Sequence, residues 1–170
     1  MKRSLAFLVI AMFAITTIQA QMRHVGGIKS IGLGYGYQEN GYQISASYGH
    51  RLSTKIEVKG NLFYEEIDFK LSDASLFGFN PKAVYTVKKI KEFYYIGVKA
   101  GVILGVENTN NEILDEKKSG FCFGENVGVT NEFYITNNLT TNLDFEQRFF
   151  QKSLFGDSSY LITITLNFKL

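Results

Sequence analysis

Charged residues that could do chemistry lie on the polar positions of several alternating segments of this chain. Asp144, Glu146 and Arg148 form one such set. Because side chains of a strand alternate between its two faces, these three would share one face. Two carboxylates on one face suit acid–base catalysis, but the arginine beside them favours a ladder of paired charges. The full set of such positions is Glu57, Lys59, Lys82, Lys99, Glu132, Asp144, Glu146 and Arg148.

The histidines and the cysteine are too few and too scattered for catalysis or metal binding. His24 precedes the first predicted strand, and His50 lies at a predicted turn beside Arg51. Neither has a serine and an acid on its own face, as nucleophilic catalysis requires. Cys122 is the single cysteine, so it forms no internal disulfide and completes no metal-ligand spacing. We therefore predict no enzymatic activity, no metal or other cofactor and no small-molecule substrate.

The elements that would position these charges are β-strands, and the clearest is Tyr160–Leu170. Its even positions are all apolar, and its odd positions are polar except for Leu161. A strand of this pattern has one apolar and one polar face. About ten residues, run at a tilt, match the hydrocarbon thickness of a bilayer. An apolar parity that reaches the last residue is typical of bacterial outer-membrane barrels, so we predict a membrane-spanning strand here.

The same two-residue period recurs in seven earlier segments, which cover residues 31–37, 42–48, 55–65, 79–87, 94–106, 121–133 and 139–149. Asn40-Gly41 predicts a tight hairpin between the first two. Pro81 weakens the fourth, and a parity change at Ile67 and Phe69 suggests a bulge or the start of a loop. Lipid cannot satisfy an open strand edge. The sequence therefore predicts an all-β, eight-stranded, antiparallel, up-and-down transmembrane barrel.

The predicted connections alternate in length, as expected of such a barrel. Short periplasmic turns are predicted at Arg51–Thr54, Lys88–Glu92 and Ile135–Asn138, and longer outer loops at Lys70–Phe77, Glu107–Ser119 and Gln151–Asp157. In this arrangement the charged set described above points into the lumen. An eight-stranded barrel has barely room for side chains, so these groups must pair or be hydrated. We predict a salt-bridge network that fills the lumen rather than a path for ions or protons.

One rival architecture is a soluble periplasmic barrel that carries an apolar ligand. Its apolar parity would face the lumen and its charged parity would face water. Two features favour the membrane barrel instead. Glycine and mixed charges crowd the polar parity, and tyrosine and phenylalanine lie near strand ends, where membrane barrels have aromatic girdles.

The N-terminus indicates export. Lys2 and Arg3 precede an apolar run over Leu5–Ile15, and Ala20 provides a small residue at a cleavage point. We predict a signal peptide over residues 1–20 and a single barrel domain over residues 21–170. Removing the signal takes away two of the 18 basic residues and none of the 16 acidic ones, so the mature charge is near zero. Direct binding to nucleic acid is therefore not expected.

Several short segments carry a family resemblance: Ala20-Gln21, Gly26-Gly27, Gly124–Gly128, Glu132–Tyr134, Glu146–Phe149 and Leu166–Leu170. Together they resemble the TraO proteins of conjugative transposons of the Bacteroides group. The resemblance implies an accessory component of a DNA-transfer apparatus in the outer membrane of a Gram-negative bacterium. It would contact lipid, and other proteins of a transfer complex through its outer loops. The alternative is a stand-alone surface or adhesion barrel, whose loops would bind a partner outside the cell.

Overall fold

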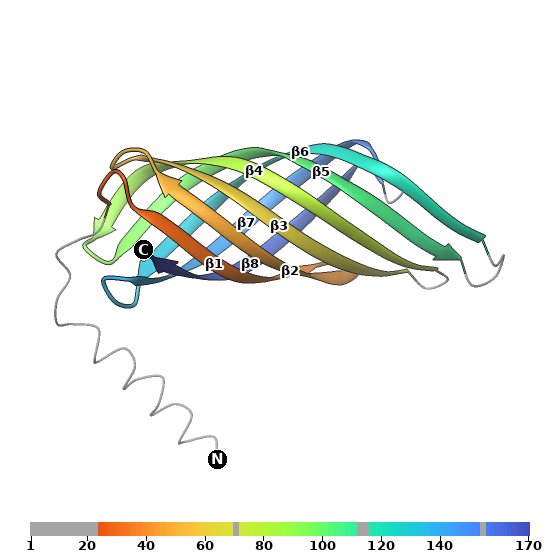
Figure 1. The fold of residues 1–170 in the computed structure, drawn as a ribbon, viewed down its shortest axis with the longest axis horizontal. Helices are drawn as coiled ribbons and strands as arrows, with labels where there is room; N and C mark the ends of the chain where they lie inside the picture. The colour runs from red at the N-terminus through yellow and green to blue at the C-terminus, as the bar shows by residue number, and fades with distance from the viewer. Residues whose placement is uncertain (1–23, 70–71, 112–115, 154–155) are drawn as a thin grey trace, which may run out of the picture.

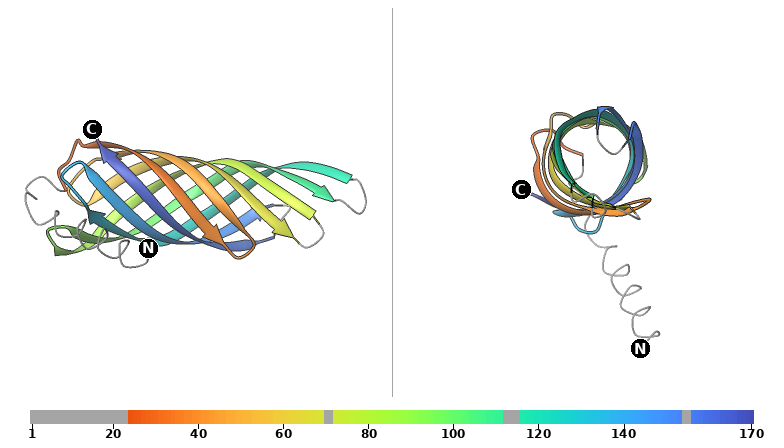
Figure 2. Two further views of the ribbon diagram at one scale, coloured as in Figure 1. Left: turned by 90° about the horizontal axis from the view of Figure 1, so that it is seen from below. Right: turned by 90° about the vertical axis from the view of Figure 1, so that its right-hand side faces the viewer.

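Eight β-strands form a closed barrel in the computed structural model, which describes residues 24–69, 72–111, 116–153 and 156–170. The strands are β1 (Lys29–Gln38), β2 (Gly41–Arg51), β3 (Ile56–Phe69), β4 (Ser72–Lys91), β5 (Tyr94–Asn111), β6 (Glu116–Tyr134), β7 (Leu139–Lys152) and β8 (Ser158–Lys169). Each pairs antiparallel with the next, and β8 pairs with β1 to close the ring (Figures 1 and 2). The predicted fold is confirmed. The predicted signal peptide over residues 1–20 lies outside the described residues.

The two-residue period decides which side chains face outward. Along β8, the side chain of Ile164 is 60% exposed, whereas that of Thr163 is 5% exposed. The same alternation holds on the other strands, with apolar residues outside and charged residues inside. A soluble carrier requires the opposite arrangement, so this structure rules out the rival architecture. No helix in the described part of the chain is long and apolar enough to cross a bilayer.

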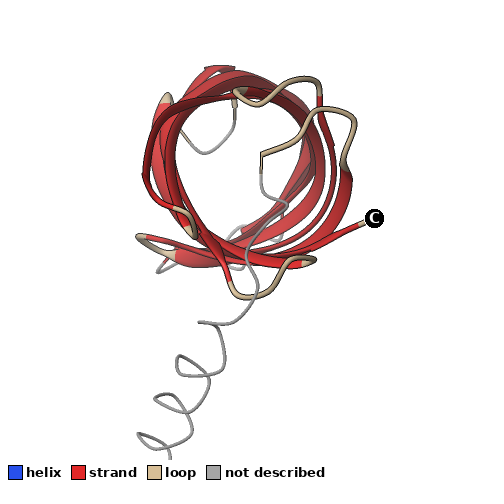
Figure 3. Ribbon diagram, turned by 90° about the vertical axis from the view of Figure 1, so that its left-hand side faces the viewer, coloured by secondary structure: helices blue, strands red, loops and turns tan. Residues whose placement is uncertain are grey.

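Short connections gather at one end of the barrel, here called the turn end, which Figure 3 views directly. They are Leu52–Lys55 between β2 and β3, Glu92 and Phe93 between β4 and β5, and Ile135–Asn138 between β6 and β7. The last matches its prediction. The predicted turn at Arg51–Thr54 begins one residue too early, because Arg51 ends β2. The predicted turn at Lys88–Glu92 is too wide, because β4 continues through Lys91. Two register shifts between β4 and β5 let the pairing continue past Thr86.

At the opposite end, the far end, two predicted loops are mostly strand. β3 and β4 pair as far as Phe69 and Ser72, and β5 and β6 pair as far as Asn111 and Glu116. The predictions of loops at Lys70–Phe77 and Glu107–Ser119 are therefore wrong, apart from residues 70–71 and 112–115, which lie outside the described residues. Backbone ladder hydrogen bonds hold these segments, and they need no apolar alternation. The third loop is shorter than predicted, since Gln151 and Lys152 belong to β7.

The predicted bulge near Ile67 is also wrong, because β3 and β4 keep one register to their ends. The parity changes because the interior becomes apolar toward the far end, where Phe63 and Leu76 are buried. The hairpin between β1 and β2 is confirmed, although its two turn residues are Glu39 and Asn40. Gly41 opens β2 instead. A Cβ there would lie 2.0 Å from the carbonyl oxygen of Glu66, so only glycine permits this close approach of β2 and β3.

Pro81 lies inside β4 despite its missing N–H. It pairs with Gly60 of β3, while the β4–β5 ladder passes from Phe79 opposite Leu104 directly to Lys82 opposite Gly101. The absent donor therefore coincides with a local gap in the ladder on one side of the strand. The strand continues on both sides of this gap.

Candidate functional site

The lumen holds six basic and six acidic side chains that are buried, counted over the described residues. All eight residues of the predicted charged set are among them, each no more than 9% exposed. Sequence reasoning missed four others: Arg51, Glu65, Glu107 and Lys169. Glu65 and Lys169 lie on the polar alternate positions of their strands, so the alternation could have predicted that they face the lumen. Arg51 and Glu107 were assigned to connections.

Glu146 of β7 is the centre of the middle layer of the lumen. Its Oε1 accepts hydrogen bonds from Lys82 Nζ at 3.0 Å and from Lys99 Nζ at 2.6 Å. Its Oε2 accepts one from Asn126 Nδ2 at 2.6 Å. Lys99 Nζ also lies 2.9 Å from Asp144 Oδ2. Two lysines and two carboxylates therefore form a neutral cluster that spans β4, β5 and β7.

Arg148 makes the next layer toward the far end. Its guanidinium donates to Glu65 of β3 and, at 2.7 Å, to Gln43 Oε1 of β2. The same guanidinium lies 5.5 Å from the centre of the Phe63 ring. Above this layer the interior is apolar, formed by Phe63, Leu76, Ile103 and Cys122 with Phe150 packed against them. An apolar cluster therefore lies next to the Arg148 layer on the side of the far end.

A third cluster closes the turn end around Glu132. This carboxylate accepts hydrogen bonds from Arg51 at 3.1 Å and from Lys169 at 3.1 Å. Arg51 also donates to Glu57 at 2.8 Å. The predicted lumen residue Lys59 completes this side, with its Nζ 3.6 Å from Glu57. These ion pairs cross the barrel from β2 and β3 to β6 and β8.

His24 is also part of the turn-end cluster, although the sequence placed it before the first strand with no partner. Its ring stacks on Tyr95 at 3.7 Å between centres, and its Nε2 lies 2.8 Å from Glu132 Oε2. Its Nδ1 lies 2.8 Å from Arg51 Nη1 and 3.1 Å from the carbonyl oxygen of Thr54. The chain therefore enters the barrel at its turn end before it begins β1.

The geometry of the charged set suits packing better than reaction chemistry. Asp144 and Glu146, the two carboxylates that could act as an acid–base pair, both contact Lys99. The six positive and six negative side chains of the described lumen balance, so together they carry no net charge. Within the described residues, no group of three His, Cys, Asp or Glu side chains could hold a metal ion. The arrangement fills and closes the barrel.

A second feature is the sheet that continues beyond the barrel at the far end. β4, β5 and β6 contain 20, 18 and 19 residues, whereas a tilted strand needs about 9–11 to cross a bilayer. We call the extension formed by residues 67–69, 72–77, 106–111 and 116–122 the outer sheet; it is the long end of β3–β6 at the right of Figure 1. β6 pairs with β7 only from Phe123 onward. Residues 116–122 therefore form an open strand edge.

The comparisons with known proteins place this fold in a class. The chain resembles the N-terminal β-barrel domain of Pseudomonas aeruginosa OprF, with 16% identity, coverage of 85% of this chain and 98% of that one, and a TM-score of 0.64. It also resembles Ail, the attachment invasion locus protein of Yersinia pestis, with 15% identity, coverage of 86% and 100%, and a TM-score of 0.61. A third similar structure is Neisserial surface protein A. It has 12% identity, with coverage of 84% of this chain and 96% of that one, and a TM-score of 0.63.

These likenesses show that the chain has the fold of small outer-membrane β-barrels. No protein-family model matches the sequence, and no curated protein matches it. Membership of the TraO-like family therefore stays a prediction.

Proposed function

We propose that this protein is a non-enzymatic outer-membrane barrel that binds a protein partner outside the cell through its outer sheet. The observation that carries the proposal is the open edge of β6 above a lumen filled with ion pairs. A filled lumen leaves the projecting sheet as the surface through which the protein meets other molecules. An extended segment of a partner can add to such an edge by main-chain hydrogen bonds.

The outward apolar belt supports the membrane location. Leu33, Ile164 and Leu166 each expose half or more of their side chains, and their neighbours on the same parity do likewise. Large contiguous apolar surfaces are rare on soluble monomers. In a bilayer this surface contacts lipid, the short turns face the periplasm, and the outer sheet lies outside the cell.

Replacing Ile164 with arginine tests this location. Near the middle of the bilayer, an outward arginine is expected to lower the free energy of unfolding by about 2–4 kcal/mol. Urea titration of the protein folded into phosphatidylcholine vesicles measures the loss. The matched control is Phe121→Arg, an outward apolar residue of the outer sheet, where we expect a change within about 0.5 kcal/mol. Equal losses at the two positions would argue against a bilayer around Ile164.

Shortening the β5–β6 hairpin tests the role of the outer sheet. Thr109 pairs with Lys118 and Asn108 with Ser119, so residues 109–118 can be replaced by Asn-Gly without changing register. We expect the shortened protein to reach the outer membrane at normal levels. Binding of whole cells to other cells or to host surfaces should fall to the level of a strain that lacks the protein. Unchanged binding would contradict a role for the outer sheet.

A more specific proposal is that the partner belongs to a conjugative DNA-transfer apparatus, as the family resemblance implies. Three residues of the resembling segments, Glu132, Glu146 and Arg148, are buried in the lumen. They therefore belong to the interior of the barrel and not to the surface that would contact the partner. The same hairpin variant provides the test. Transfer frequency in the variant and the deletion strain should fall together if the partner is transfer machinery. Normal transfer with lost cell binding would favour the surface or adhesion barrel.

A further inference from the structure

The turn end carries a group of exposed lysines that take no part in the ion pairs of the lumen. Lys55 lies in the β2–β3 connection, Lys88 and Lys89 lie in β4, and Lys91 is the last residue of β4. We call these four residues the lysine patch. The backbone N–H of Thr86 donates to the carbonyl oxygen of Lys55 at 2.7 Å. Lys55 therefore lies beside the end of β4, and four side chains of one sign occupy adjoining segments.

The positive charge of the lysine patch is not neutralised by neighbouring carboxylates. None of the four lysines forms an ion pair with another residue in the part of the chain that the structure describes. Lys89 Nζ lies 6.0 Å from the centre of the Tyr95 ring, and Lys91 Nζ lies 5.8 Å from that of Phe93. Glu92 is the one exposed acidic side chain among the described residues of this end. The patch keeps a net positive charge, which favours an anionic partner.

Aromatic side chains place the lysine patch at the level of lipid headgroups. Tyr85 is 46% exposed on the outward face of β4, three residues before Lys88. Lys88 pairs with Ile96 and Lys91 with Tyr94, and these partners belong to the outward alternate positions of β5. Tyrosine side chains of membrane barrels lie at the interface between hydrocarbon and headgroups. Lysines just beyond them can rest their stems on apolar surface and extend their ammonium groups to lipid phosphates.

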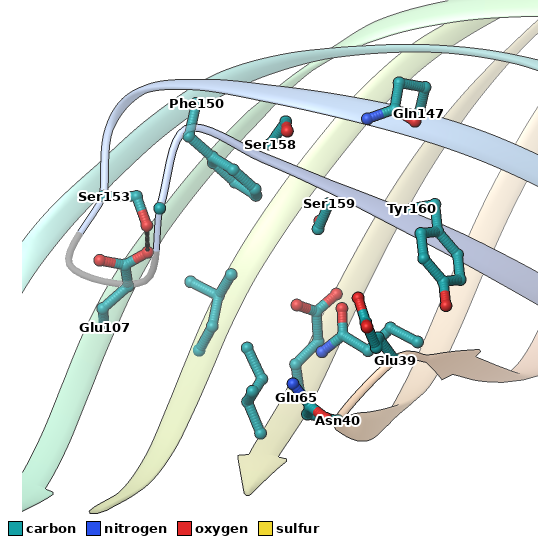
Figure 4. A pocket seen from close by; sticks show the side chains of 14 residues that line it. Glu39, Asn40, Glu65, Glu107, Gln147, Phe150, Ser153, Ser158, Ser159 and Tyr160 are labelled. Atoms are coloured by element: carbon teal, nitrogen blue, oxygen red, sulfur yellow. Dashed lines mark hydrogen bonds between the residues drawn. The ribbon is translucent and has the colours of Figure 1, made fainter. Parts of the chain in front are cut away.

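The far half of the barrel has no comparable patch among its described residues. Its exposed charged side chains have both signs, and they are Glu39, Glu66, Lys118, Glu125, Lys152 and Asp157. A pocket of about 350 Å³ opens at the far end, and its described lining contains no lysine or arginine (Figure 4). An excess of exposed positive charge is therefore a property of the turn end.

We propose that the lysine patch binds the headgroups of anionic phospholipids in the periplasmic leaflet of the membrane. Lys88 and Lys91 would contact a phosphate from the lipid-facing side, and Lys55 and Lys89 would contact it from the rim of the barrel. A zwitterionic headgroup carries no net charge, so the patch would concentrate anionic lipid at this place. The inference rests on the bilayer location proposed above and goes beyond it by naming the class of lipid.

The test uses single tryptophans, because the sequence contains none. Phe93→Trp places a reporter in the β4–β5 connection beside the patch, and Phe145→Trp places one on the outward face of β7, away from it. Each protein is folded into phosphatidylcholine vesicles in which a minor fraction of the lipid is brominated, either phosphatidylglycerol or phosphatidylcholine. Bromine quenches the fluorescence of a nearby tryptophan. We expect phosphatidylglycerol to be preferred about fivefold around Phe93→Trp and the two lipids to quench Phe145→Trp equally. High salt should weaken the preference because ions screen exposed charges.

Variants in the Phe93→Trp background assign the preference to the patch. Lys88→Gln/Lys91→Gln should reduce it to about twofold or less, whereas Lys88→Arg/Lys91→Arg keeps the charge and should retain it. Lys29→Gln/Lys152→Gln removes as much charge from exposed positions outside the patch and should leave the preference unchanged. Equal quenching by the two lipids in Phe93→Trp, or equal losses in the two glutamine variants, would overturn the proposal. Absence of quenching by either lipid in Phe145→Trp would instead contradict the bilayer location itself.

Discussion

Replacing Arg148 with methionine is expected to lower the free energy of unfolding by about 3–5 kcal/mol. Arg148 is buried, and its guanidinium neutralises Glu65, which is also buried. Methionine fills much of the same space but leaves the carboxylate of Glu65 without its counter-charge, and removes the donor to Gln43. A buried charge that loses its partner costs far more than an exposed one. Urea titration in vesicles measures the change.

The double variant Arg148→Met/Glu65→Leu distinguishes this cause from lost packing. Removing both charges eliminates the unpaired carboxylate, so the double variant should recover most of the stability lost in the single variant. The recovery is expected because Phe63 and Leu76 form an apolar cluster in the interior next to this layer, so methionine and leucine would have apolar neighbours. If the double variant is as unstable as Arg148→Met alone, loss of side-chain packing rather than of the ion pair explains the effect.

Replacing Glu146 with leucine should lower the free energy of unfolding by a similar amount, about 3–5 kcal/mol. This residue accepts hydrogen bonds from both Lys82 and Lys99, so its removal leaves two buried lysines to share Asp144. The matched control is Glu125→Leu, which removes a carboxylate from an exposed position of the same barrel. That change is expected to stay within about 0.5 kcal/mol. Vesicle unfolding again provides the measurement.

Charge balance in the middle layer can be restored without Glu146. In Glu146→Leu/Lys82→Met, the remaining pair is Lys99 with Asp144, whose atoms already lie 2.9 Å apart. We expect this double variant to be more stable than Glu146→Leu. The opposite order would show that the hydrogen bond from Asn126 to Glu146, at 2.6 Å, matters more than the charge balance.

Much of the fold follows from the sequence because strand parity is a local property. Alternation along Tyr160–Leu170 and in the seven earlier segments predicted both the number of strands and the face on which each residue lies. It placed all eight members of the charged set on the inner face. It failed at the far end, where residues 72–77 and 107–111 are strand without a membrane-spanning pattern. There a strand is held by its neighbours, which a single segment does not reveal.

The contacts inside the lumen could not be predicted from the same pattern. Arg148 meets Glu65 across 83 positions of sequence, and Lys82 meets Glu146 across 64. Parity says that these side chains point inward, but only strand register and barrel closure decide their height and their partners. His24 is the clearest case, since no periodic pattern surrounds it, yet it lies against Tyr95 and Glu132.

The sequence alone therefore determined the inner and outer faces of this protein, because alternation of side chains along a strand depends on nearest neighbours in the chain. The tertiary structure decided which charges pair, how far β3–β6 project beyond the barrel, and that Lys55 lies beside the end of β4 at the turn end. These features join residues that are distant in sequence. They depend on the stagger between strands once the ring is closed, which is a property of the whole barrel.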